Sequence, residues 1–272
     1  MTTKVLILGG GYVGLYTALT LRRRARGLVD ITVLDRRPYM TYQPFLPEAA
    51  AGSIEPRHAV VPLRRELRGV KILQGKVERI RHQDRVVEAV TDFDDHLAVE
   101  YDVLIVALGS VSRTLPIPGL ADFAMGFKYV EEAIHLRNQV LGRIARAATT
   151  EDPEHRKRLL TFVFVGGGFA GVEAFAETED MARAALRYYP ELNPTDLHFV
   201  MVEAAGRILP EMGPDMGAYT VKQLEKRGMR VLLETRLDSC VDGHIELSNG
   251  EKFEADTVVW TAGVKPAPVL SE

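Results

Sequence analysis

Cysteine is nearly absent from the sequence: Cys240 is the only one among 272 residues. A disulfide framework, a cysteine-ligated metal site and a CxxC redox pair are therefore excluded within this chain. Reactions that need reactive cysteines, such as thiol–disulfide reduction or sulfide:quinone reduction, are disfavoured for the same reason. We interpret Cys240 as a buried bystander, and the low cysteine content favours a reducing cytoplasm as the location.

Long apolar runs and a strong net charge are also lacking. No stretch approaches the roughly 20 apolar residues that a membrane span requires. The formal net charge is -3, so no general attraction to nucleic acid is expected. No histidine pair has the spacing of metal ligands, and no metal is predicted. The chain is 46% hydrophobic and 26% charged, as in ordinary globular proteins, and its length suits two domains.

Glycine, by contrast, occurs in a repeated pattern. Residues 5–16 read VLILGGGYVGLY and residues 162–173 read FVFVGGGFAGVE. In each copy an apolar, β-type run leads into G-x-G-x-x-G and then into a helix-compatible run. The glycines are Gly9, Gly11 and Gly14 in the first copy, and Gly166, Gly168 and Gly171 in the second. The next predicted strand ends in an acid in both copies, at Asp35 and at Glu203.

These residue types suit a dinucleotide. The N-terminus of a helix offers unpaired N–H groups and a positive dipole end to a pyrophosphate. The first glycine permits the tight turn, the second leaves room for the phosphates, and the third lets helix and strand pack closely. Asp35 follows Gly14 by 21 residues, near the expected spacing of roughly 20, whereas Glu203 follows Gly171 by 32 and requires a longer helix and loop.

The acid at the end of the second strand also bears on the choice of nucleotide. Its carboxylate accepts hydrogen bonds from the adenosine ribose and repels a 2′-phosphate. Glu203 therefore favours NADH over NADPH. Arg207 lies close in sequence and leaves NADPH open as an alternative.

The remaining pattern completes a duplicated architecture. We predict a helix over 130–148, a polar loop over 149–158, and short strands over 70–73, 76–80, 85–90 and 96–110. The strand of 96–110 ends in ALGS, with Ala107 and Gly109, and a strand over 253–266 carries TAG, with Ala262 and Gly263. The predicted fold class is α/β, with two Rossmann-like dinucleotide-binding domains that have parallel sheets and a small β-excursion each. Residues 1–115 would form the first domain, 116–250 the inserted second domain and 251–272 the return to the first.

Together with these motifs, the segment YQPFLPEAAAG (42–52) and the strand end WTAGVKP resemble type II NADH dehydrogenases. The resemblance extends from the first strand to about Pro266. It implies an FAD-dependent oxidoreductase that takes hydride from NADH and passes electrons to a quinone-type acceptor. FAD would occupy the first unit and NADH the second.

The resemblance also implies roles for individual residues. Gln43 and Pro44 match a pair beside the isoalloxazine ring. Glu173 matches a glutamate near flavin and nicotinamide with a proposed role in coupling or proton supply; the alternative is an acid of the first helical turn that interacts with the helix dipole. The FAD positions are Gly9, Gly11, Gly14, Asp35, Ala107 and Gly109, the NADH positions are Gly166, Gly168, Gly171 and Glu203, and the second strand end adds Ala262 and Gly263.

The chain departs from the resembled family after the TAG strand. A glycine–aspartate motif, a quinone-side segment and a membrane-binding part do not appear before Glu272. We therefore expect a truncated FAD-binding domain, and peripheral contact with the inner face of the cell membrane only in a longer form. Relatives of this fold often dimerise, so a homodimer is expected. Two alternatives stay open: a reductase of a soluble electron carrier, and a non-catalytic dinucleotide-binding or redox-sensing module.

Overall fold

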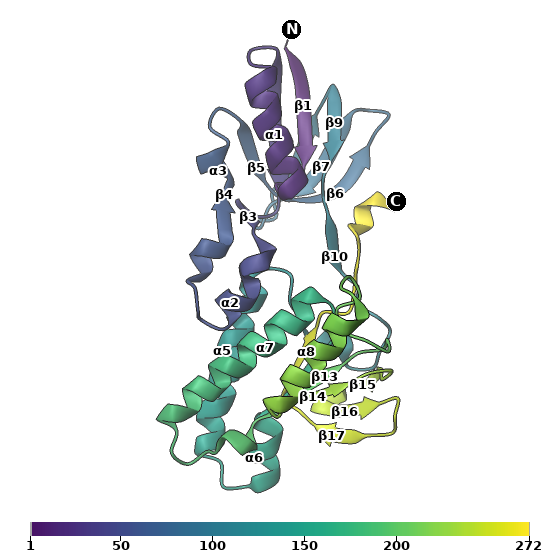
Figure 1. The fold of residues 1–272 in the computed structure, drawn as a ribbon. Helices are drawn as coiled ribbons and strands as arrows, with labels where there is room; N and C mark the ends of the chain where they lie inside the picture. The colour runs from purple at the N-terminus through teal and green to yellow at the C-terminus, as the bar shows by residue number, and fades with distance from the viewer. Residues whose placement is uncertain (1, 272) are drawn as a thin grey trace. The chain divides into compact units, whose positions relative to one another are not determined.

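The structure is a computed structural model that describes residues 2–271, and it divides into two compact units. Unit 1 consists of residues 1–42, 60–111 and 264–272, and unit 2 of residues 43–59 and 112–263. The chain therefore passes between the units at four points (Figure 1). Residues 43–59 and 251–263 group with unit 2, and the domain boundaries at 115 and 250 stay a prediction.

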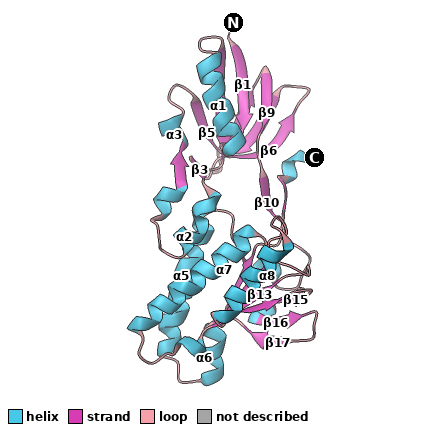
Figure 2. Ribbon diagram, in the orientation of Figure 1, coloured by secondary structure: helices cyan, strands magenta, loops and turns pink. Residues whose placement is uncertain are grey.

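Unit 1 is built on a parallel sheet in the order β5-β2-β1-β9. Its strands are β1 (Thr3–Leu8), β2 (Val29–Asp35), β5 (Lys71–Gln74) and β9 (Val103–Val106). Helix α1 (Tyr12–Arg24) connects β1 to β2, and an antiparallel excursion precedes β9, as Figure 2 shows. The smaller elements are β3 (Tyr39–Thr41), β4 (Val60–Pro62), α3 (Leu63–Glu66), β6 (Lys76–Arg81), β7 (Val86–Val90) and β8 (His96–Glu100).

Strand β1 is buried on both faces, which explains its continuous apolar sequence. Val5 and Ile7 pack with Leu15 and Ala18 of α1. Leu6 and Leu8 alternate with them and pack on the other face with residues of the β6–β8 sheet. This period of two is the strand geometry expected from the sequence.

Unit 2 repeats the plan with a five-stranded parallel sheet in the order β11-β18-β12-β13-β14. The strands are β11 (Met125–Gly126), β12 (Thr161–Val165), β13 (His198–Val202), β14 (Arg230–Leu232) and β18 (Thr257–Trp260). Its helices are α2 (Leu46–Ala50), α4 (Leu120–Phe123), α5 (Val130–Ala148), α6 (Pro153–Leu159), α7 (Phe169–Ala185) and α8 (Pro214–Lys226). The excursion is the antiparallel sheet of β15 (Leu237–Ser239), β16 (His244–Leu247) and β17 (Lys252–Glu254).

The two faces of the second sheet hold different cores. Phe162 and Phe164 of β12 contact Phe199 of β13, and Phe175 of α7 contacts Phe164 and Phe199. Val163 and Val165 face the opposite cluster, which includes residues of β15–β17. Helix α7 also packs against α5 and α2, so α2 completes this unit although it comes early in the chain.

Several sequence predictions differ from the structure. The predicted loop over 149–158 contains helix α6, which Asp152 caps by accepting a hydrogen bond from the Glu154 N–H at 3.0 Å. The predicted strand over 96–110 is three strands, β8, β9 and β10 (Ser110–Ser112). It breaks at Asp102, whose N–H donates to the Lys4 carbonyl at 2.9 Å. The run 253–266 is likewise divided among β17, β18 and β19 (Val264–Pro266), and β19 pairs with β10.

Candidate functional site: two matched glycine cradles

The first cradle lies at the end of β1 in unit 1. Gly9 has φ +99°, a region that favours glycine, and a Cβ there would overlap the carbonyl oxygen of Ala107. Gly14 is buried in α1, and a Cβ there would overlap the Gly9 carbonyl oxygen. A Cβ at Gly11 would meet nothing within 4 Å, so the space in front of the helix is open. The predicted roles of the three glycines therefore fit their surroundings.

Asp35 ties the first cradle together. Its Oδ2 accepts the N–H of Gly10 at 2.5 Å and its Oδ1 accepts the N–H of Arg37 at 2.7 Å. Burial raises the pKa of Asp35, while the hydrogen bonds from Arg37 and Gly10 act in the opposite direction. The carboxyl group thus orders both the glycine loop and the turn after β2.

The second cradle in unit 2 reproduces these features. Gly166 has φ +114°, and a Cβ at Gly171 would overlap the Gly166 carbonyl oxygen. A Cβ at Gly168 would again meet nothing within 4 Å. Glu203 accepts the N–H of Gly167 at 2.5 Å and that of Ala205 at 2.7 Å. Glu203 therefore makes the same hydrogen bond as Asp35 despite its longer spacing. Part of the extra length is in α7, which has 17 residues where α1 has 13, and the rest is in the connection from Ala185 to His198.

The N-termini of α1 and α7 are free to bind an anion in the same manner. Their N-cap glycines have nearly the same φ, −71° at Gly11 and −73° at Gly168, and neither supplies a side-chain cap. Neither helix has an acid in its first turn. The terminal N–H groups and the positive dipole end therefore offer an anion a binding position beside Gly11 and Gly168, where a Cβ would meet nothing within 4 Å.

The strand ends beside the two cradles are only partly equivalent. The N–H of Ala107 donates to the Leu8 carbonyl at 2.8 Å, and the N–H of Thr261 donates to the Val165 carbonyl at 2.8 Å. Thr261 adds side-chain hydrogen bonds to Val165 and Gly166. Thr261 was not among the predicted site residues, although its place before Ala262 and Gly263 in the TAG strand end was the available signal.

The glycines of the strand ends occupy turns. Gly109 has φ +66° and Gly263 has φ +93°, so both adopt a conformation that favours glycine. The carbonyl of Gly263 accepts the N–H of Arg113 at 3.1 Å. Ala262 is half-buried beside the core of unit 2. Contact of Ala107, Gly109, Ala262 and Gly263 with a cofactor stays a prediction.

Gln43, Pro44 and Glu173 all belong to unit 2. Gln43 and Pro44 are exposed in the 3-10 turn Gln43–Phe45, which leads directly into α2. Helix α2 packs against α7, the helix that carries Glu173. Glu173 is the fifth residue of α7 and lies beyond its first turn. Its catalytic role and the place of Gln43 and Pro44 beside a flavin stay predictions.

Carboxyl groups from α2 and α7 influence Glu173. Partial burial of the Glu173 carboxyl raises its pKa, although the residue as a whole is exposed, and the charges of Glu48 and Glu177 raise the pKa further. Burial likewise raises the pKa of Glu177, with contributions from Asp180 and Glu48. The Oε2 atom of Glu48 is buried and lacks a hydrogen-bond partner among residues 2–271. A proton can thus be held on Glu173 at a higher pH than on an ordinary glutamate.

The variant Glu173→Gln is expected to be more stable than the parent chain at pH 7.5. Between the ordinary pKa of 4.5 and the raised pKa the folded state binds more protons, so stability falls as pH rises through this window. The gain is less than about 1 kcal/mol, because solvent screens an exposed carboxyl. Thermal melts from pH 4 to pH 8 test this, with Glu191→Gln as an exposed control. A gain that stays equally large at pH 4 contradicts it.

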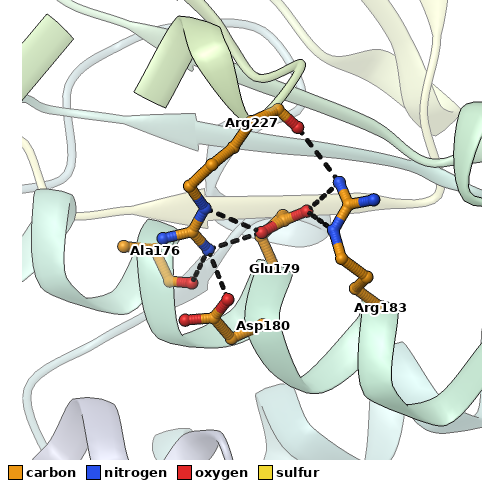
Figure 3. A network of polar contacts seen from close by, with 5 residues as sticks. All are labelled: Ala176, Glu179, Asp180, Arg183 and Arg227. Carbon is orange, nitrogen blue, oxygen red and sulfur yellow. Dashed lines mark hydrogen bonds and ion pairs between the residues drawn. The ribbon is translucent and has the colours of Figure 1, made fainter. Parts of the chain in front are cut away.

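An ion-pair network anchors the C-terminal half of α7. The Glu179 side chain is 1% exposed, and Arg183 and Arg227 both donate to it (Figure 3). Arg227 also donates to the Ala176 carbonyl at 2.9 Å and to Asp180 at 2.8 Å. Arg183 donates to the Arg227 carbonyl at 3.0 Å. The network fixes the end of α8 to α7, the helix whose N-terminus forms the cradle.

The two cradles define a class of proteins with two dinucleotide-binding domains in one chain. The sequence model of the pyridine nucleotide-disulphide oxidoreductase family matches residues 3–272, and the chain belongs to this family. The predicted α/β fold class is thereby confirmed, and the family supports binding of a flavin and of NAD(H). Among residues 2–271 no group of three or more histidine, cysteine, aspartate or glutamate side chains is arranged to hold a metal ion.

Named relatives are similar over nearly the whole chain. The type II NADH:quinone oxidoreductase NdhA of Mycobacterium tuberculosis is 32% identical over 98% of this chain and 57% of its own length. The type II NADH:quinone oxidoreductase of Staphylococcus epidermidis is 30% identical over 99% of this chain and 66% of its own length. These names agree with the resemblance found in the sequence. The chain spans about three fifths of the length of such relatives.

Solved structures share the fold. NDH2 of Plasmodium falciparum in complex with NADH superposes with a TM-score of 0.93 at 21% identity, covering 99% of this chain and 57% of that protein. A ferredoxin reductase from Rhodopseudomonas palustris has a TM-score of 0.74 at 21% identity, covering 99% of this chain and 61% of that protein. Both similarities concern the fold alone.

Proposed function

We propose that the chain is the dinucleotide-binding part of an FAD-dependent NADH dehydrogenase of the type II NADH:quinone oxidoreductase kind. The observation that carries the proposal is the pair of cradles. In the first the N–H of Gly10 donates a hydrogen bond to Asp35, and in the second the N–H of Gly167 donates one to Glu203. Two pyrophosphate sites on one chain suit a reaction between two dinucleotides. The names of the relatives favour NADH as donor and a quinone as acceptor.

The residues of unit 1 would hold FAD. Gly9, Gly11 and Gly14 admit its pyrophosphate to the N-terminus of α1, and Asp35 accepts a hydrogen bond from the ribose. When bound, the flavin supplies the chemistry of accepting hydride and releasing electrons to a second acceptor. No protein nucleophile is required, in agreement with the single cysteine, which is buried at position 240.

The residues of unit 2 would hold NADH. Gly166, Gly168 and Gly171 admit its pyrophosphate to α7, and Glu203 binds its ribose. Glu173 lies one turn beyond this N-terminus, and its raised pKa suits a group that holds a proton at a higher pH than an ordinary glutamate. Gln43 and Pro44 would lie beside the isoalloxazine ring, and the strand ends at Ala107, Gly109, Ala262 and Gly263 would contact the cofactors.

The proposal extends to the cellular setting of the longer protein. A quinone is a membrane-dissolved acceptor, so we place the longer protein on the inner face of the cell membrane as a peripheral protein. Among residues 2–271, none of the helices combines the length and apolarity of a membrane span.

The resemblance also implies a homodimer, which size-exclusion chromatography tests. A soluble electron carrier is the second candidate acceptor, since a ferredoxin reductase shares the fold.

The purified chain is expected to show flavin absorption near ~450 nm that bleaches when NADH is added without oxygen. The spectrum is recorded on the chain as purified and again after incubation with FAD and removal of unbound flavin. Reoxidation by a short-chain quinone, compared with reoxidation by ferredoxin, then separates the two acceptors. A colourless chain that also fails to take up FAD would contradict the proposed flavin site and favour a non-catalytic dinucleotide-binding module.

A further inference from the structure

The turn after Glu203 would border the adenosine ribose of a nucleotide bound in the second cradle. Both carboxylate oxygens of Glu203 are engaged, Oε2 by Gly167 and Oε1 by Ala205. The acid in this position of a dinucleotide fold binds the ribose 2′-hydroxyl, and residues near it meet the 2′-phosphate when the ligand is NADPH. The turn of residues 204–207 is therefore the surface that a 2′-phosphate would approach.

A second segment is hydrogen-bonded to this turn. The N–H of Glu234 donates to the Ala205 carbonyl at 3.0 Å, and the N–H of Thr235 donates to the Glu203 carbonyl at 3.0 Å. Thr235 is buried, and its hydroxyl donates to the Leu233 carbonyl at 2.8 Å. These hydrogen bonds fix the segment that follows β14 beside the turn of residues 204–207.

Glu234 has an unusual backbone in this segment. Its φ is +51°, in the left-handed region where a side chain other than glycine is disfavoured. A glutamate kept in a strained conformation suggests that its side chain is needed there. A Cβ built on Gly206 would lie 3.6 Å from the Glu234 Oε1 atom, so the carboxylate lies against the turn.

The positive charge of Arg207 does not offset the negative charges of Glu203 and Glu234 in the structure. Arg207 Nη2 donates to the Pro210 carbonyl at 2.9 Å, which directs the guanidinium toward the following loop. A 2′-phosphate at this turn would meet the carboxylates of Glu203 and Glu234 together, and like charges at short range repel. The 2′-hydroxyl of NADH carries no charge and meets no such repulsion.

We infer that Glu234 is a second specificity-determining residue, which acts with Glu203 to exclude the 2′-phosphate of NADPH from unit 2. This inference rests on the proposed role of the second cradle as the NADH site. The backbone bonds to Ala205 and Glu203 hold Glu234 at the turn. Glu203 recognises the ribose, whereas Glu234 acts only against the phosphate.

Fluorescence titration of the purified chain with NADH and with NADPH tests the inference. Glu234→Gln is expected to tighten NADPH binding about fivefold and to leave NADH binding within about twofold, because one like charge is removed from a solvent-screened site. Glu203→Gln is expected to weaken NADH binding, and the double variant is expected to bind NADPH better than either single variant. Glu225→Gln on α8, an exposed carboxyl, is the control and should leave both affinities unchanged.

The remaining outcomes of the titration distinguish a failure of the inference from a failure of the proposed function. If NADH binds to the parent chain but Glu234→Gln leaves the NADPH affinity unchanged, the inference fails and the proposed function stands. If neither nucleotide binds to the parent chain, the dinucleotide site in unit 2 is refuted and the inference falls with it. Glu234→Gly removes the charge and relieves the left-handed strain, so it replaces Glu234→Gln if the amide variant does not fold.

Discussion

Gly171→Ala is expected to destabilise unit 2 by about 3 kcal/mol, in the upper part of the range for overpacked cores. The added methyl would overlap the Gly166 carbonyl oxygen and approach the Thr261 hydroxyl to 2.6 Å. The carbonyl cannot readily move aside, because it accepts a hydrogen bond from the Thr261 hydroxyl at 3.1 Å. The N–H of the same peptide group, that of Gly167, also donates to Glu203 at 2.5 Å. Urea unfolding followed by far-ultraviolet circular dichroism measures the loss.

Gly168→Ala is the matched control at the same helix end. Its methyl meets nothing within 4 Å and its φ of −73° suits alanine, so stability should stay within about 1 kcal/mol of the parent chain. The methyl would nevertheless stand where the pyrophosphate approaches α7, and NADH binding should be lost. Equal stability losses in the two variants, or full NADH binding by Gly168→Ala, would contradict the assigned roles.

Arg227→Ala is expected to cost about 2–4 kcal/mol of unfolding free energy. The substitution removes the paired guanidinium from Glu179, whose side chain is 1% exposed, and a buried carboxylate without its full set of partners is strongly destabilising. Arg183 still donates to Glu179, which keeps the loss below that of a completely unpaired charge. The Ala176 carbonyl also loses its hydrogen bond from Arg227.

Two further variants identify the cause of the stability loss that is expected for Arg227→Ala. Arg230→Ala, three residues along, removes an exposed ion pair with Glu251 at 2.9 Å and should cost less than about 1 kcal/mol. Adding Glu179→Gln to Arg227→Ala should recover part of the loss, since an amide needs no counter-charge. A cost for Arg227→Ala no larger than that for Arg230→Ala would show that the network in Figure 3 contributes little.

The cradles could be predicted from the sequence because their chemistry is local. A strand, three glycines at fixed positions and a helix lie within about a dozen residues, and each glycine has its own steric reason. The acids Asp35 and Glu203 end apolar strands, so they too can be read from the pattern. The helix over 130–148 was predicted with its observed bounds because its apolar residues recur at helical spacing.

The predictions that were wrong concern short elements and tertiary partners. Helix α6 has seven residues, and its many charges favoured a loop, although Asp152 before Pro153 is a helix-start signal. The role of Glu48 depends on packing between segments far apart in the chain, which no local pattern contains, whereas Thr261 had a local signal in the TAG strand end. The place of Glu234 could not be predicted from the sequence either, because its left-handed backbone and its position against Gly206 are seen only in the folded structure.

The placement of α2 affects how the protein must assemble during synthesis. All four strands of the first parallel sheet are complete by residue 106, but α2 needs α5 and α7 as packing partners. Buried residues of α2, among them Leu46, Ala49 and Ala50, therefore leave the ribosome well before the surface that covers them. The parallel sheet of the first unit can form while α2 is still exposed, and Val269 adds to the core of that unit only at the end of synthesis. An isolated second unit that began at residue 112 would lack α2 and would expose the apolar surface of α5 and α7 to solvent.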